Sequence, residues 1–277
     1  MLAMVSATRA TPAWGVHESP HSLVAQSTAS EKHRQSDGWG IAWFRGPRAQ
    51  WLKSPKPVHD EAEVVKRTTI DAVSRFSIAH IRDASNPLKL DKQKLLSLEN
   101  TQPFAFQNYV FAHNGTLNIP KEVLATLGPW KRRMQGVNDS EVLFWLLMSY
   151  IEEGRPFPTA FAATVSHIWR VWEKLDRKSG EPYTGLNVVF SDGKSSYGAC
   201  HFLSYPTPPR NALCTENWPF WQMCFRPEKG RVWIASEPLD KKPGWRTLAP
   251  NDYIRATFDK DRIRWNIGRL AVPSLPA

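Results

Sequence analysis

Residues 186–203 read LNVVFSDGKSSYGACHFL, and this stretch decides the fold class. Two segments rich in β-branched and aromatic residues, 186–191 and 197–203, are separated by only a short polar connection. Parallel neighbours need a crossover of about a dozen residues or more, so these two strands are expected to run antiparallel. Residues 252–258 and 263–267 repeat the pattern on either side of the charged turn 259–262.

The rest of the chain mixes strands with amphipathic helices. Further strands are expected at 40–44, 76–81, 109–113 and 232–235, and helices at 61–74, 121–127, 140–152 and 159–175. Residues 142–148 are apolar on every side, which predicts a helix buried between layers. The order predicts an α+β fold with antiparallel sheets rather than a doubly wound one. We expect a single domain over 1–277, with a motif core at 1–150 and late strands and an insertion at 186–267.

Composition and charge exclude several classes of protein. The 277 residues are 42% hydrophobic, which argues against disorder, and the longest apolar run is far shorter than a membrane span. We expect neither a secretory signal nor a membrane partner, and three cysteines fit a reducing, cytoplasmic compartment. The net charge of +10 is spread along the chain, and its densest basic cluster is Lys131-Arg132-Arg133. We therefore expect no nucleic-acid partner.

The first two motifs place polar residues beside predicted strands. Ser36-Asp37-Gly38-Trp39-Gly40 directly precedes a strand, and its two glycines allow a sharp turn and a close backbone approach. An ordinary turn with a core tryptophan would look the same. In the second motif an apolar strand runs into Arg82, whose planar guanidinium suits a carboxylate, although such an arginine is more often a surface ion-pair partner. His80 is more typical of a core histidine than of a catalyst.

Two later motifs allow a structural and a functional interpretation. Asn114-Gly115 follows a strand and is typical of a hairpin turn. The same carboxamide and the N–H of Gly115 could instead point at one oxygen, as in an oxyanion hole. Asn138-Asp139-Ser140-Glu141 is typical of a helix cap, yet Asp139 could also pair with a substrate ammonium.

Other catalytic arrangements are not indicated. Cys200 and His201 are neighbours on a predicted strand, so their side chains should point to opposite faces. No spacing typical of a metal site or of a nucleotide-binding loop is present, so we expect neither a metal nor a cofactor.

Taken in order, the motifs resemble the class II glutamine amidotransferases, and within them the stand-alone, single-domain bacterial group. The segments that carry the resemblance are DGWG (37–40), HIRDAS (80–85), NTQPF (100–104), AHNGT (112–116) and NDSE (138–141). ASEPL (235–239) followed by Trp245 is similar to the late segment of the same group, so the resemblance spans residues 1 to about 255. It implies the N-terminal-nucleophile hydrolase fold, a four-layer αββα sandwich of two antiparallel sheets.

The resemblance also implies a role for each motif. Arg82 would hold the α-carboxylate of glutamine, with Ser85 and the Gln102 segment beside it, and Asp139 would hold the α-ammonium. Asn114 and Gly115 would form the oxyanion hole. The remaining residues, expected to border the pocket, are Gly38, Trp39 and Gly40. The partners implied are glutamine or a γ-glutamyl small molecule and, where ammonia is not simply released, a separate ammonia-accepting protein.

The nucleophile departs from the family pattern. Family members begin Met-Cys, and the exposed cysteine attacks the side-chain amide, whereas the first cysteine in this sequence is Cys200. Either the start lies about three residues too late, with a leucine codon acting as initiator, or the chain is a pseudoenzyme that binds without cleaving. The complete set of expected binding residues favours the first explanation.

The sequence also allows two other functions and two interpretations of one segment. A γ-glutamyl amide hydrolase, as in ergothioneine biosynthesis, is the nearest enzymatic alternative. A basic partner- or nucleic-acid-binding module on the same fold is the alternative from another class, and salt-sensitive binding would distinguish it. The Pro- and Trp-rich stretch 205–227 is either a lid or partner surface or an irregular insertion.

Overall fold

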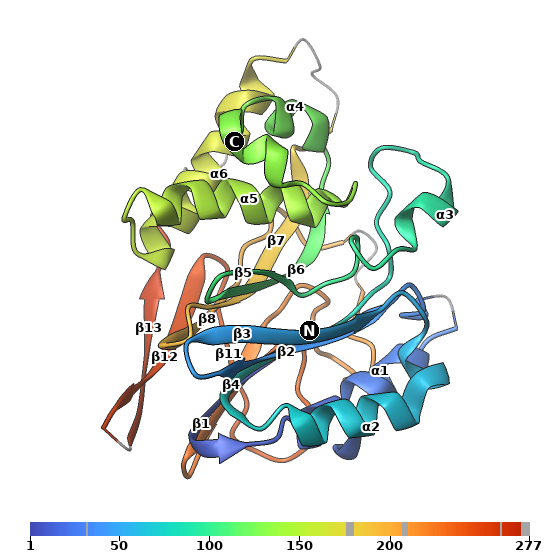
Figure 1. Ribbon diagram of the computed structural model, residues 1–277, viewed down its shortest axis with the longest axis vertical. Helices are drawn as coiled ribbons and strands as arrows, with labels where there is room; N and C mark the ends of the chain where they lie inside the picture. Colours follow the sequence, from blue (N-terminus) through green and yellow to red (C-terminus); the bar gives the residue numbers. More distant parts are fainter. Residues whose placement is uncertain (32, 176–179, 207–209, 261, 273–277) are drawn as a thin grey trace.

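Two antiparallel sheets lie face to face in the computed structural model, and helices cover the outer face of each (Figure 1). The structure describes residues 1–31, 33–175, 180–206, 210–260 and 262–272. The predicted α+β sandwich of two antiparallel sheets is therefore confirmed.

The first sheet has seven strands in the order β11-β9-β10-β1-β4-β2-β3. Its strands are β1 (Leu2–Ala10), β2 (Trp39–Arg45), β3 (Arg48–Ser54), β4 (Ser74–Ile81), β9 (Cys224–Glu228), β10 (Arg231–Ala235) and β11 (Arg246–Thr247). Strand β1 lies at the centre and pairs antiparallel with β4 on one side and β10 on the other. The sheet therefore joins the first and the last third of the chain.

The second sheet has six strands in the order β13-β12-β8-β7-β6-β5. Its strands are β5 (Phe104–Phe106), β6 (Tyr109–Leu117), β7 (Tyr183–Ser191), β8 (Ser195–Ala199), β12 (Asp252–Asp259) and β13 (Arg262–Arg269). The two segments of the opening stretch pair as β7 and β8, in the antiparallel sense that their short connection requires. The β12–β13 hairpin projects from one side of the sandwich (Figure 1).

The helices form the two outer layers. Below the seven-stranded sheet lie η1 (Trp14–Glu18), α1 (Leu23–Thr28), η2 (Val58–Glu61) and α2 (Ala62–Asp71). Above the six-stranded sheet lie α4 (Pro120–Ala125), η3 (Gly128–Arg133), α5 (Asp139–Glu152) and α6 (Phe157–Glu173), and α3 (Lys92–Leu95) stands in a long loop to one side (Figure 1). Among the described helices, none is long and apolar enough to cross a membrane.

Three separate hydrophobic cores hold the four layers together. Alternate residues of one strand point to opposite faces, so each central strand contributes to two cores. In β1, Ala3 and Val5 pack between the sheets, whereas Leu2 and Met4 pack against the lower helices. In β7, Val189 enters the middle core and Val188 the upper one. This alternation explains why strands that are buried on both faces read as continuous apolar runs.

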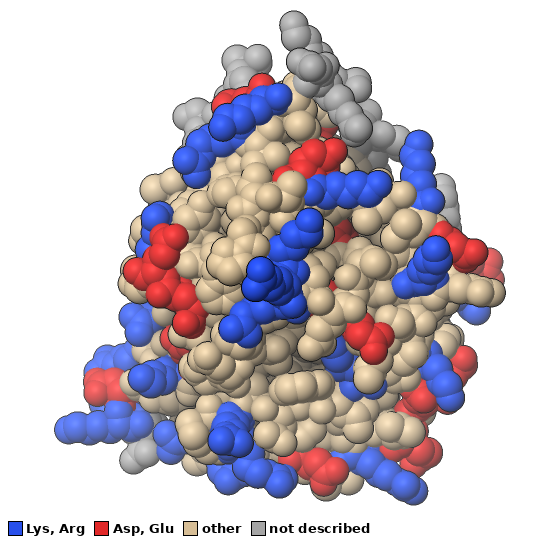
Figure 2. Space-filling view, turned by 45° about the horizontal axis from the view of Figure 1, so that its top comes forward, with Lys and Arg blue, Asp and Glu red and all other residues tan. Residues whose placement is uncertain are grey.

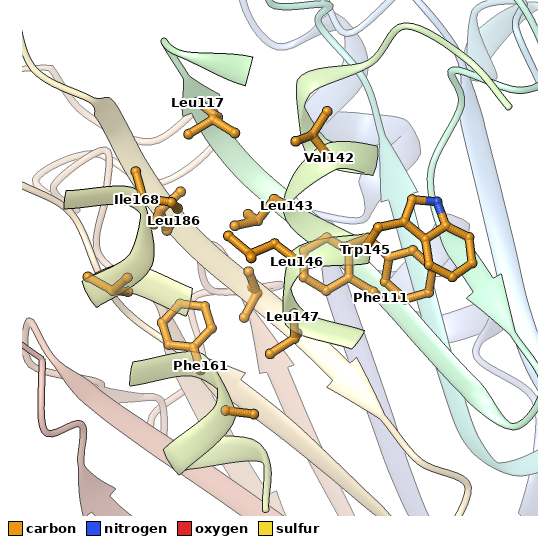
Figure 3. Close-up of a cluster of buried hydrophobic side chains, with 14 of the residues drawn as sticks. Phe111, Leu117, Val142, Leu143, Trp145, Leu146, Leu147, Phe161, Ile168 and Leu186 are labelled. Atoms are coloured by element: carbon orange, nitrogen blue, oxygen red, sulfur yellow. The ribbon is translucent and has the colours of Figure 1, made fainter. Parts of the chain in front are cut away.

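The upper core is the one that the sequence indicated most clearly. Helix α5 is buried from Asp139 to Met148, as its apolar stretch predicts, and it packs on β6 beside α6. Figure 3 shows Leu143, Leu146 and Leu147 of α5 directed toward Phe161 and Ile168 of α6.

Several expectations about elements need correction. Strand β6 continues through Asn114 and Gly115, so the expected hairpin turn there is wrong. Strand β8 ends at Ala199, before Cys200, and residues 224–227 of the expected insertion belong to β9. The rest of that insertion includes residues 207–209, and the turn 259–262 includes residue 261, all outside the described residues. Strand β1 and the edge strands β3 and β5 were not expected.

The upper core predicts a large stability effect. Leu147 is fully buried, so Leu147→Ala is expected to lower the free energy of unfolding by about 2–5 kcal/mol, through lost burial and a residual cavity. Ile70, which is 69% exposed, supplies the control Ile70→Ala, with an expected change within about 0.5 kcal/mol. Urea unfolding measures both, and an equal effect of the two substitutions would contradict the layer assignment.

Candidate active site

A cavity of about 310 Å³ opens where the ends of β4 and β6 meet the start of α5. Most of its lining is polar, and it includes Arg82, Asp83, Ser85, Gln102, His113, Asn114, Gly115, Asn138, Ser140, Thr184 and Arg210. Five of the residues singled out from the sequence therefore line one cavity: Arg82, Ser85, Gln102, Asn114 and Gly115.

Arg82 is fixed by its backbone and by one hydrogen bond of its side chain. It follows β4 directly, its N–H donates to the carbonyl of Gly38 at 2.9 Å, and Nη1 donates to the carbonyl of Leu95 at 2.7 Å. Burial lowers the pKa of the guanidinium, while the nearby carboxylates of Asp139 and Asp37 raise it. An arginine stays charged in such a setting, so the cavity contains a buried cation with free donors.

Asp139 lies behind Ser85 rather than in the lining itself. Ser85 Oγ donates to Asp139 Oδ1 at 3.0 Å, and the N–H of Leu117 donates to Oδ2 at 2.8 Å. Asp139 is the first residue of α5, where the helix dipole favours a negative charge. Arg82 and Asp139 are close enough to influence each other, so the structure brings together the two opposite charges that the sequence singled out.

Asn114 and Gly115 occupy the part of β6 that borders the cavity. The carboxamide of Asn114 makes no hydrogen bond to a described residue, which leaves its donors available to a ligand. Gly115 has φ +149°, and a Cβ at this position would collide with the carbonyl oxygen of Gly185. Only glycine therefore fits at this point of the strand.

A buried network fixes the strand behind these two residues. His113 Nδ1 lies 2.9 Å from Ser140 Oγ, and Nε2 lies 3.0 Å from the carbonyl oxygen of Gly185. Gln102 Oε1 accepts from the N–H of His113 at 2.6 Å, and Gln102 Nε2 donates to the carbonyl of His113 at 3.1 Å. The side chain of Gln102 is thus used to hold β6, which makes it a support of the cavity wall rather than a free donor.

The structure does not bring Gly38, Trp39 and Gly40 into the cavity lining. Trp39 is buried in the lower core, and its Nε1 donates to Glu61 Oε2 at 2.9 Å. Gly38 contributes only the carbonyl that accepts from Arg82, and a Cβ on Gly40 would collide with the carbonyl oxygen of Gln102. These three residues lie behind the residues that line the cavity. Because Gly38 and Gly40 have no side chain, the segments of Arg82 and Gln102 can approach them closely.

A second cavity of about 60 Å³ is lined in part by Met1 and shares lining residues with the first. Five residues line both cavities: Gln35, His80, Ile81, Asn114 and Phe220. The amine of Met1 lies 3.2 Å from Ser236 Oγ, and burial lowers its pKa to about 5. An amine at this end of β1 is therefore uncharged at neutral pH.

His80 was expected to be a core histidine, and it is only 6% exposed. It nevertheless lines both cavities, and its Nδ1 has no hydrogen-bond partner among the described residues. Burial, followed by the nearby N-terminal charge, lowers the pKa of His80 well below its usual value. His80 therefore presents a neutral imidazole to the site, with one ring nitrogen that makes no hydrogen bond to a described residue.

Other lining residues were missed because their sequence neighbourhoods carry no motif. Thr184 stands at the start of β7, and Gln35 lies in a loop before β2. Arg210, Phe220 and Trp221 come from the segment between β8 and β9, where only the density of aromatic residues was a signal.

The cysteines lie outside both cavity linings. Burial raises the pKa of the Cys200 thiol to about 12 and of the Cys214 thiol to about 11, and that of Cys224 is raised as well. His201 bonds to Tyr183 and Asn251 rather than to Cys200. Over the part of the chain that the structure describes, no group of three or more His, Cys, Asp or Glu side chains is placed to hold a metal.

The buried histidines predict a pH dependence of stability. Burial lowers the pKa of His113 in the folded state, so between that value and about 6.5 the unfolded state binds more protons. The free energy of unfolding should therefore fall as the pH is lowered from 7.5 to 5. In His113→Gln this fall should be shallower, by up to about 1.4 kcal/mol per pH unit, and urea unfolding at several pH values measures it. Identical slopes for parent and variant would contradict a neutral, buried His113.

Comparison with known proteins places this geometry in a family. The family model of the class II glutamine amidotransferases matches residues 1–257. A Haemophilus influenzae protein whose name assigns it to the glutamine amidotransferases is 35% identical over 236 residues, 79% of this chain and 72% of the relative. A Mycobacterium tuberculosis γ-glutamyl-hercynylcysteine sulfoxide hydrolase is 23% identical over 252 residues, 87% of this chain and 86% of the relative.

The solved structures agree on the fold. A class II glutamine amidotransferase domain protein from Silicibacter pomeroyi superposes with a TM-score of 0.61 at 20% identity, covering 85% of this chain and 92% of that one. Because the family match extends over most of the chain and the sandwich has the same architecture, the chain belongs to the class II glutamine amidotransferases.

Proposed function

We propose that the larger cavity binds glutamine or a γ-glutamyl amide and that the protein hydrolyses the side-chain amide through an N-terminal cysteine. The observation that carries the proposal is the pairing of a buried cation, Arg82, with a nearby carboxylate, Asp139, beside the free carboxamide of Asn114. A glutamyl group presents a carboxylate and an ammonium on one carbon, and such a pair of charges needs matching partners within a few ångströms.

Each side chain then has a role in the proposal. Arg82 binds the α-carboxylate, and Asp139, together with Ser85, attracts the α-ammonium. The side-chain carbonyl points to Asn114 and the N–H of Gly115, which stabilise the negative charge that develops on its oxygen. Gly115 lines the cavity at a position where the carbonyl of Gly185 leaves no room for a side chain.

The strand register supports a position for the nucleophile. Leu2 pairs with Ala79 across β1 and β4, so two residues added before Met1 in the same register would lie opposite Ile81 and Arg82, which line the cavity. A Met-Cys-Arg extension would, after removal of its methionine, present a cysteine at the second of these positions.

The chemistry follows from this placement. The α-amine takes the thiol proton, and the sulfur forms a bond to the carbonyl carbon of the amide. The C–N bond then breaks, the nitrogen leaves as ammonia or an amine with the proton, and a γ-glutamyl thioester remains. Water hydrolyses the thioester to release glutamate and restore the thiol.

The proposal has two forms, which differ in the physiological substrate. The name of the Haemophilus relative supports glutamine, and that of the Mycobacterium relative supports a larger γ-glutamyl amide. The alternative without catalysis is a protein that binds such a compound and releases it unchanged. The basic net charge offers less support for a nucleic-acid-binding module, because acidic and basic side chains are interspersed on the face shown in Figure 2.

Binding can be tested without any catalytic step. Arg82→Ala and Asp139→Asn are each expected to weaken glutamine binding by about 2–4 kcal/mol, the cost of removing one partner of a buried charge. Isothermal calorimetry at neutral pH measures the affinity. Arg155→Ala, which removes an exposed arginine that contacts Glu153 and the ring of Tyr150 outside the cavity lining, is the matched control and should bind as the parent does. Equal affinity in all four proteins would overturn the assignment.

Catalysis can be tested by extension. The polypeptide that begins at Met1 is expected to release no ammonia from glutamine, because each of its thiols lies away from the cavity. Adding Met-Cys-Arg before Met1 should create ammonia release, since the binding and oxyanion groups are already in place. Replacing the added cysteine by alanine should abolish the release while leaving binding intact. If the extended protein folds, binds glutamine and releases no ammonia, the binding-only alternative stands.

A further inference from the structure

The segment between β8 and β9 adds a second arginine to the cavity wall. Arg210 lines the larger cavity together with Phe220 and Trp221 of the same segment. The glutamyl group of the proposed function brings one carboxylate and one ammonium, for which Arg82 and Asp139 are sufficient. Arg210 is therefore a cation that glutamine itself does not require.

This wall is held in place by specific contacts. The carboxylate of Glu237 accepts from the N–H of Cys214 at 2.8 Å and from that of Leu213 at 3.3 Å. Two backbone hydrogen bonds close the segment on itself, from Ala212 to Trp218 at 2.8 Å and from Phe220 to Arg210 at 3.0 Å. Glu237 lies two residues after the end of β10 and is only 3% exposed, so the wall is tied to the seven-stranded sheet.

The guanidinium of Arg210 lies over an aromatic ring. Its Cζ is 3.8 Å from the centroid of the Phe220 ring, a cation–π contact that holds it at the cavity wall. The ion pairs among the described residues do not include Arg210, and Asp83 acts on it only through space. A planar guanidinium held in this way is suited to bind a carboxylate with two of its N–H groups.

We infer that the preferred ligands are γ-glutamyl amides whose amine portion carries a carboxylate, as in a γ-glutamyl amino acid, and that Arg210 binds this second carboxylate. The inference rests on the proposed function, which places the glutamyl portion at Arg82 and Asp139. The carbon chain of the amine portion would then lie against the rings of Phe220 and Trp221.

Two ligands of nearly equal size test the inference. γ-Glutamylglycine and γ-glutamylethylamide differ by a carboxylate in place of a methyl group. Calorimetry with the protein that begins at Met1 should show the glycine conjugate binding about tenfold more tightly, the size expected of one charge-assisted hydrogen bond. Arg210→Ala should remove this preference, so that the two ligands bind the variant with about the same affinity. Arg264→Ala, which removes an exposed arginine of β13, should keep it.

The outcomes separate the inference from the proposed function. If the parent binds both ligands equally, or Arg210→Ala weakens both alike, the inference is overturned while the glutamyl site stands. If neither ligand nor glutamine binds to the folded parent, the proposed function fails and the inference fails with it. Circular dichroism and thermal unfolding of Arg210→Ala establish that the variant is folded.

Discussion

The side chains of strand β1 pack into two hydrophobic cores, one on each face of the sheet. The rest of the structure depends on this double burial. Strand β1 lies between β4 and β10, so its backbone groups are paired on both sides, and its side chains alternate between the middle and the lower core. A shift by one residue would exchange the two sets of side chains, which makes the register highly specific. The same register brings the start of the chain to the end of β4, where Arg82 and the cavity lie. Folding of the sheet and assembly of the site are thus one event.

The polar groups of the site are held from behind by groups that do not enter it. His113 links the start of α5, through Ser140, to the carbonyl that crowds Gly115. Gln102 makes hydrogen bonds to both backbone groups of His113, and Ser85 shares Asp139 with the backbone of β6. Inside a protein such bonds are stronger than in water, and each unpaired group costs more. Sites of this kind change little when a ligand arrives, so their donors can be in position before any charge develops.

Much of the architecture was predictable from the sequence, because short connections force antiparallel pairing and an apolar helix has to be buried. Strands β7 and β8 and helix α5 follow from these two rules alone. Strand β1 was missed because small and apolar residues near the start of a chain lack the alternation typical of a half-exposed strand. Asn114-Gly115 was expected to form a turn because that dipeptide usually does, yet pairing with β7 keeps it extended.

The site was predictable in part. Four of the expected binding residues line one cavity near the ends of β4 and β6, and their sequence motifs had indicated this position. They are Arg82, Ser85, Asn114 and Gly115. Gly38, Trp39 and Gly40 belong to the same motifs but lie outside the cavity lining, and Trp39 is part of the lower core. Arg210 and Phe220 could not be found, since the segment that carries them has no periodicity and its path depends on contacts with residues far away in the sequence, among them Glu237 and His21.

Because this wall of the cavity is held largely by contacts outside the cores, its composition can change with little effect on the stability of the sandwich. Between Arg210 and Phe220 no residue is a buried member of a core; Trp218 packs against the lower core from its edge, Thr215 Oγ1 lies 3.3 Å from His21 Nδ1, and Glu237 accepts two of the segment's N–H groups. Substitutions among these residues other than Trp218 would alter one wall of the cavity while the sandwich keeps its packing and Arg82 and Asp139 keep their positions. A lineage could therefore change the shape and charge of this wall by small steps without losing the packed sandwich.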